Sequence, residues 1–142
     1  MSSQALAFAV HIISLGLTIC AIAVADHTGL DWVRGKRATV QAHKLTQLHW
    51  AVGIGLGLMI GSGFALFWPM REYLLASPAF YVKMAFVLAL VINSLVIERL
   101  MHVATTSPFK QLHDATKKKL LLSGTVSAVS WIGAAVTAFF LF

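Results

Sequence analysis

Long apolar stretches separated by shorter polar ones run through this sequence. Four apolar runs cover residues 5–25, 50–68, 79–97 and 120–142. A helix of about 20 residues crosses the ~30 Å hydrocarbon core of a bilayer. Lipid offers no partner to backbone polar groups, so helices are favoured, and stretches such as 86–92 lack the alternation of membrane β-strands. The pattern predicts an all-α, polytopic membrane protein with one domain over residues 1–142, a four-transmembrane-helix bundle.

The first run could be mistaken for a signal peptide, since residues 23–25 read Ala-Val-Ala, like a cleavage site. A signal peptide begins with a positively charged region. Residues 1–10 contain no Lys or Arg. We therefore expect the first run to be a helix of the mature protein.

The polar connections differ in charge. Residues 26–49 hold four basic and two acidic side chains, and residues 98–119 hold five and two. Residues 69–78 hold only Arg71 and Glu72. Because cytoplasmic loops are enriched in Lys and Arg, the two basic connections are predicted to be cytoplasmic, which gives an N-out/C-out topology. No helix breaker interrupts residues 37–50, so a helical stretch is expected there.

Composition narrows the classes of protein. Hydrophobic residues make up 58% of the chain and charged residues 11%, against about 25% charged in soluble domains. This excludes a soluble enzyme, a disordered chain and a disulfide scaffold, and the single cysteine, Cys20, can form no internal bridge. The net charge of +6 is attributed to membrane orientation, with no nucleic-acid partner. The expected partners are the lipid bilayer, a redox partner in the membrane and further copies of the chain in a homo-oligomer.

Ionisable residues within membrane spans are candidates for function. His11 in the first run and Lys83 in the third qualify, and both lie a few residues from the outer ends. Two structural alternatives stay open: a hydrogen bond from His11 to a Ser or Thr of another helix, and snorkelling of Lys83 to the interface. We expect both side chains to face the interior of the bundle.

Small and hydroxyl residues form stripes at helical spacing. His11 shares a face with Ser14, Thr18 and Ala25, and the fourth run has a similar stripe from Ser123 to Thr137. In the second run, Gly57 and Gly61 have the small-xxx-small spacing of close helix packing. These stripes fit either simple packing or room for a flat prosthetic group.

A second group of histidines lies at the predicted cytoplasmic ends, where His49 precedes the second run and His102 follows the third. Neutral imidazole is the commonest metal ligand and an axial ligand of haem. His11, His49 and His102 are therefore candidate ligands of a metal or cofactor. The sequence contains no CxxCH, HExxH or cysteine-pair motif.

The segments Val10-His11-Ile12-Ile13 and Phe80-Tyr81-Val82-Lys83-Met84-Ala85-Phe86 resemble the copper-resistance protein D superfamily and its HemJ-type relatives, the small bacterial membrane protoporphyrinogen oxidases. The resemblance implies a helical protein of the bacterial inner (cytoplasmic) membrane that binds haem b. It also implies an essential histidine early in the first helix and an essential lysine early in the third, positions that His11 and Lys83 match as catalytic candidates.

Two departures limit what the resemblance carries over. The stretch Ala25-Asp26-His27-Thr28-Gly29 replaces a Leu-Pro-Arg stretch that follows the first helix in the oxidases, and Asn93 stands near the place of a second histidine. Haem binding or a redox role is therefore expected, and whether the chain is an enzyme, with porphyrinogen oxidation as its reaction, stays open.

The leading hypothesis is a haem b protein that moves electrons in the membrane. The alternatives are copper handling, suggested by the resemblance and by soft methionine ligands such as Met59, Met70, Met84 and Met101, and a non-catalytic packing subunit of a membrane complex.

Overall fold

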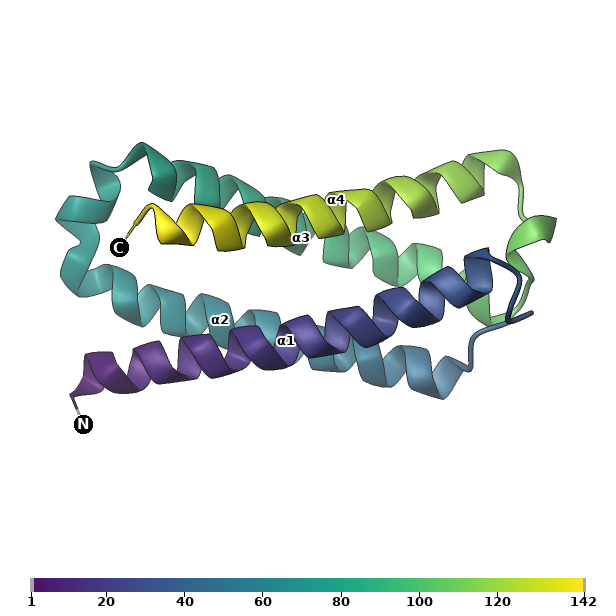
Figure 1. Cartoon of the computed structure of the whole chain (residues 1–142), viewed down its shortest axis with the longest axis horizontal. Helices are drawn as coiled ribbons and strands as arrows, with labels where there is room; N and C mark the ends of the chain where they lie inside the picture. The colour runs from purple at the N-terminus through teal and green to yellow at the C-terminus, as the bar shows by residue number, and fades with distance from the viewer. Residues whose placement is uncertain (1, 142) are drawn as a thin grey trace. The chain divides into compact units, whose positions relative to one another are not determined.

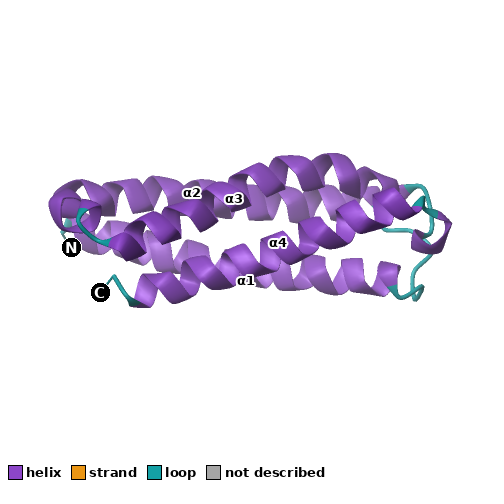
Figure 2. Cartoon of the chain, turned by 90° about the horizontal axis from the view of Figure 1, so that it is seen from above, coloured by secondary structure: helices purple, strands orange, loops and turns teal. Residues whose placement is uncertain are grey.

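A computed structural model of the chain describes residues 2–141, so Met1 and Phe142, at the ends of the predicted domain and of the fourth run, lie outside the described residues. The elements are α1 (Ser3–Val33), α2 (Ala42–Leu75), α3 (Pro78–Met101), two short 3₁₀ turns, η1 (His102–Thr105) and η2 (Phe109–Gln111), and α4 (Asp114–Phe139) (Figure 1). The described residues contain helices and loops and no strand (Figure 2). The predicted all-α class is confirmed.

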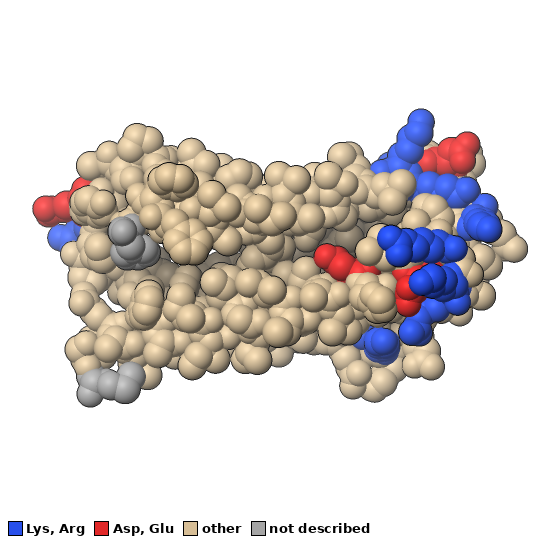
Figure 3. Space-filling model, viewed as in Figure 1, with Lys and Arg blue, Asp and Glu red and all other residues tan. Residues whose placement is uncertain are grey.

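All four long helices are long and apolar enough to cross a membrane. On the face seen in Figure 3, charged side chains gather near helix ends and leave the middle stretches of the helices apolar. Large apolar side chains such as Leu17, Leu122 and Ile132 are well over half exposed, as expected for side chains that face lipid. The chain is a multi-pass membrane protein.

The helices extend beyond the apolar runs that predicted them. α2 begins at Ala42 and continues through Pro69 to Leu75, so only Ala76 and Ser77 separate it from α3. The turn predicted over residues 69–78 is therefore wrong in extent. A proline removes only one donor from the helix, and the residues after Pro69 include good helix formers such as Met70, Arg71 and Glu72. α4 begins at Asp114 and ends at Phe139, short of the predicted end at residue 142.

The chain comprises two compact units, residues 1–71 and 72–142, which we describe separately. In the first unit, α1 and α2 lie side by side and antiparallel (Figure 1). His11 on α1 contacts Ser62 on α2. Thr18, seven residues later on α1, contacts Gly55, seven residues earlier on α2, as expected for an antiparallel pair. The buried residues of α1 are Ser14, Thr18, Thr28 and Trp32, all on the stripe that contains His11.

Gly35 ends α1 sharply. Its φ of 77° is in the left-handed region, which is unfavourable for residues with a side chain but not for glycine. Its N–H donates to the Trp32 carbonyl and the N–H of Lys36 donates to the Asp31 carbonyl, the two bonds of a Schellman motif. The Asp31 carboxylate also lies 3.7 Å from Arg37 and 3.6 Å from His27. This turn sends the chain back toward α2.

In the second unit, α3 and α4 pack against each other as an antiparallel pair. Pro78 occupies the first turn of α3, where its missing N–H costs nothing, and His113 caps α4 by accepting a bond from the Ala115 N–H through Nδ1. Asn93 meets Ser123, and Phe86 packs over Gly133. Leu90, between Phe86 and Asn93 on the same face, is buried.

Candidate functional site

His11 lies at the interface of α1 and α2, half-buried, with its Nδ1 atom 2.9 Å from the hydroxyl oxygen of Ser62. The Cε1–Nδ1 edge of the ring lies against the backbone of Gly63, where a β-carbon would stand 3.5 Å from Cε1. The structure therefore contains the interhelical bond to a serine that was the structural alternative for His11. It also places His11 on the face of α1 that contacts α2.

The bonds around Ser62 determine which nitrogen of His11 carries the proton. The Ser62 hydroxyl lies 2.6 Å from the Leu58 carbonyl and 3.2 Å from the Met59 carbonyl, and carbonyls only accept. Because a hydroxyl has one proton, Ser62 donates it to its own helix and accepts from His11. Neutral His11 is thus protonated on Nδ1, and its Nε2 atom carries the lone pair.

A shallow apolar groove of about 380 Å³ adjoins this contact. Val10 and Ala7 of α1 and Gly57, Gly61 and Ser62 of α2 are among its lining residues. A β-carbon at Gly57 or Gly61 would meet no described atom within 4 Å, so these glycines leave open space beside the helix pair. The groove therefore provides apolar room next to the histidine.

A close approach of α1 and α2 lies at Gly55, not at Gly57 or Gly61. A β-carbon at Gly55 would collide with Thr18, which is 1% exposed and donates through Oγ1 to the Ser14 carbonyl at 2.6 Å. The glycine pair with the sequence signature of close packing, Gly57 and Gly61, does not make this contact. Periodicity places residues on a helix face but does not set the register between two helices.

Lys83 belongs to the second unit, on the face of α3 that includes Phe86, Leu90 and Asn93. This is the face that packs on α4. The lysine is half-buried, and among the described residues its ammonium group forms no hydrogen bond or ion pair. A cation at this position is costly in a membrane unless an anion or the interface receives it.

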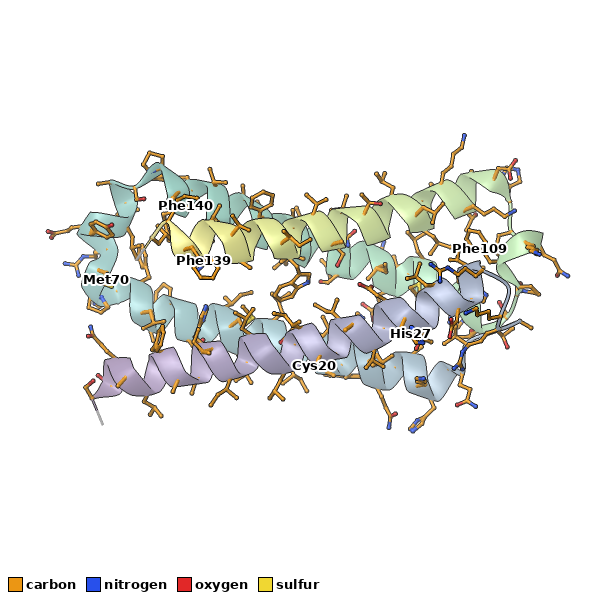
Figure 4. All side chains as sticks on the ribbon, in the orientation of Figure 1. Cys20, His27, Met70, Phe109, Phe139 and Phe140 are labelled. Atoms are coloured by element: carbon orange, nitrogen blue, oxygen red, sulfur yellow. The ribbon has the colours of Figure 1, made fainter. Side chains whose placement is uncertain are left out.

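His49, at a predicted cytoplasmic end, is not brought to His11. His49 lies 13 residues before Ser62 on α2, about 20 Å along the helix axis, so His49 and His11 cannot ligate the same metal ion. His102 begins η1 in the second unit and is exposed. His27, labelled in Figure 4, is also exposed and lies beside Asp31. The described residues contain no group of three or more His, Cys, Asp or Glu side chains that could hold a metal ion.

Asn93 forms a two-bond contact in the second unit. Its Nδ2 donates to the Ser123 carbonyl at 3.0 Å, and its Oδ1 accepts from the Ser123 hydroxyl at 2.7 Å. Both residues are buried. The residue that departs from the family pattern is therefore fully used in holding α3 to α4.

Ser62 is the residue that sequence reasoning missed. It is the only hydroxyl residue between Trp50 and Trp68, in a run otherwise composed of Gly and apolar residues. A lone polar residue in such a run indicates an interhelical bond, because lipid tails offer its hydroxyl no hydrogen-bond partner.

Comparisons with known protein families, with curated proteins and with solved structures return no match.

Proposed function

We propose that this protein is a haem b-binding redox protein of the bacterial inner membrane, with His11 as an axial ligand of the haem iron. The observation that carries the proposal is the His11–Ser62 bond, which leaves the lone pair of the imidazole on Nε2. Histidines that ligate metals commonly donate their other N–H to a fixed acceptor, which orients the ring and raises its basicity. Ser62 meets that description.

The surroundings of His11 suit a flat apolar group. The groove beside it is almost wholly apolar and is bordered by Gly57 and Gly61, which present backbone in place of side chains. Cofactor sites are mostly apolar with few fixed polar groups. Here Ser62 lines the groove, and His11 is bonded to Ser62. A b-type haem held there would supply a one-electron redox couple.

We assign Lys83 to an anion in this proposal. The lysine lies on the packed face of α3, near the start of the helix, and the carboxylate of a substrate bound in this unit would offset its charge. Ser14 and Thr18 continue the His11 face of α1, and both are buried in the helix pair. His49, in the first unit, and His102, in the second, each remain candidate ligands.

One observation favours a second candidate, the packing subunit. In the described part of the chain, His11 and Asn93 each form a hydrogen bond with a serine of the neighbouring helix. Such bonds join membrane helices without any cofactor. Copper handling has less support, because the methionines on each helix are far apart. Met59 and Met70 are separated by about 16 Å along α2, and Met84 and Met101 by about 26 Å along α3.

The absorbance and metal content of the purified full-length chain test the proposal. Haem b bound at about one equivalent, with a Soret band that shifts on reduction by dithionite, is the expected result. A colourless, metal-free protein obtained from cells supplied with haem precursor would contradict it and favour the packing subunit. A colourless protein that holds copper would favour the copper alternative.

A further inference from the structure

The segment that joins α3 to α4 and opens α4 carries a dense group of positive charges, Lys110, Lys117, Lys118 and Lys119, which we name the lysine cluster. Asp114 is the only acidic residue from 102 to 119. Among the described residues, no carboxylate pairs with any member of the cluster. The helix macrodipole disfavours cations in the first turns of α4, so helix stability does not account for three successive lysines there.

Lys117 differs from the rest of the cluster because it is bound within the protein. Its Nζ donates to the Lys110 carbonyl at 3.2 Å and lies 5.7 Å from the centre of the Phe109 ring. Phe109 lies in the connection between the two helices (Figure 4). Lys117 is half-buried, whereas Lys110, Lys118 and Lys119 are exposed.

Lys118 begins the lipid-facing stripe of α4. Steps of four and three residues lead from Lys118 to Leu122, Thr125, Val129, Ile132 and Val136, and all of these residues are exposed. Leu122 and Ile132 are each 65% exposed. In a helix that crosses a membrane, an exposed apolar stripe contacts lipid tails. The Cα atom of Lys118 lies about 6 Å before that of Leu122 along the axis. Lys119, three residues before Leu122, flanks the same stripe.

We infer that Lys118 and Lys119 bind the headgroup phosphates of anionic phospholipids in the leaflet next to this connection. Their charge complements phosphate, and their position at the end of an exposed apolar stripe places headgroup and acyl chain of one lipid on one helix face. Nucleic acid would use the charges but not the stripe, so the arrangement favours lipid. Lys117 has its ammonium directed to Phe109 and Lys110 and lies outside this surface.

Native mass spectrometry of the purified full-length protein in neutral detergent tests the inference. Dioleoyl-phosphatidylglycerol is titrated into the protein, and dioleoyl-phosphatidylcholine, which has the same tails and no net charge, is titrated in a parallel experiment. A lysine near an anionic surface changes affinity about fivefold, so K118Q/K119Q is expected to lower phosphatidylglycerol affinity about 25-fold and to leave phosphatidylcholine unchanged. K118R/K119R is expected to bind like the parent chain.

The matched control is K117Q, which removes the same charge one residue away from a side chain that faces inward. It is expected to change phosphatidylglycerol affinity less than twofold, against about fivefold for K118Q. Equal losses in K117Q and K118Q would show a net-charge effect and overturn the inference. Unchanged phosphatidylglycerol binding in K118Q/K119Q would also overturn the inference. If the same variant loses binding to a single-stranded polynucleotide, the lysines serve nucleic acid and not lipid.

Discussion

Ser62 on α2 accepts the Nδ1 proton of His11 on α1 and gives its own proton to the Leu58 carbonyl of its helix. One hydroxyl thereby joins two membrane helices and fixes the tautomer of the only histidine within the four predicted spans. The structural and the functional interpretations of His11 are compatible in this contact, because packing uses Nδ1 and the proposed ligation would use Nε2.

Replacing Ser62 with Ala separates the two roles. The interhelical bond is worth about 0.6 kcal/mol on average in a membrane protein, so S62A is expected to unfold only slightly earlier in a denaturant titration. Loss of the acceptor behind a metal-bound histidine typically costs 10–100-fold in affinity, and we expect a loss of this size in haem affinity. S62T, which keeps a hydroxyl, is the control. Unaltered haem affinity in S62A would contradict the assigned role of Ser62.

The contact of Gly55 with Thr18 makes a prediction about stability alone. A methyl group at Gly55 collides with the buried Thr18 side chain, so G55A is expected to lose about 1–3 kcal/mol. G53A, two residues away with no described atom within 4 Å of its β-carbon, is expected to gain about 0.4–1 kcal/mol. Thermal unfolding in detergent measures both, and a G55A chain as stable as G53A would refute the close approach.

Substitutions at Asn93 and Ser94 are expected to differ in stability in a similar way in the second unit. N93L removes both bonds to Ser123 at nearly constant volume, and a loss of about 1 kcal/mol is expected. Ser94, the next residue, bonds only to the Val91 carbonyl of its own helix. S94A is therefore expected to stay within about 0.5 kcal/mol of the parent chain. Denaturant titration of the two variants checks the difference, and equal stabilities would count against the Asn93–Ser123 contact.

The N-out/C-out orientation is tested with reporters on the intact chain. The basic connections at residues 26–49 and 98–119 are predicted to be cytoplasmic. Alkaline phosphatase fused to the C-terminus is then active, and a fluorescent protein that folds only in the cytoplasm is dark there. A fusion of the same fluorescent protein within residues 36–40 is the positive control. A bright C-terminal fusion would reverse the topology.

Much of the fold follows directly from the sequence. Apolar runs of membrane-spanning length predicted four helices, and the absence of a breaker after residue 37 predicted helix before Trp50, which α2 provides from Ala42. The stripe of His11, Ser14 and Thr18 lies on the packed face of α1. These features depend on length and period, which a sequence displays.

The site depends on register, which a sequence does not display. Neither Ser62 as partner of His11 nor Gly55 as the point of close approach follows from helical period, because sliding one helix past another by a turn preserves every face. The predicted end of α2 is wrong for a local reason. A proline such as Pro69 often ends a helix, but here α2 continues through it.

The most direct test of the central claim is the haem content and absorption spectrum of single histidine-to-alanine variants of the purified chain. We predict that H11A loses bound haem, while H43A, which changes an exposed histidine near the start of α2, keeps the parent spectrum. H49A and H102A are measured beside them. Full haem content and an unchanged spectrum in H11A, with loss in H49A or H102A, would contradict the assignment of His11 and place the ligands at the inner ends of the helices.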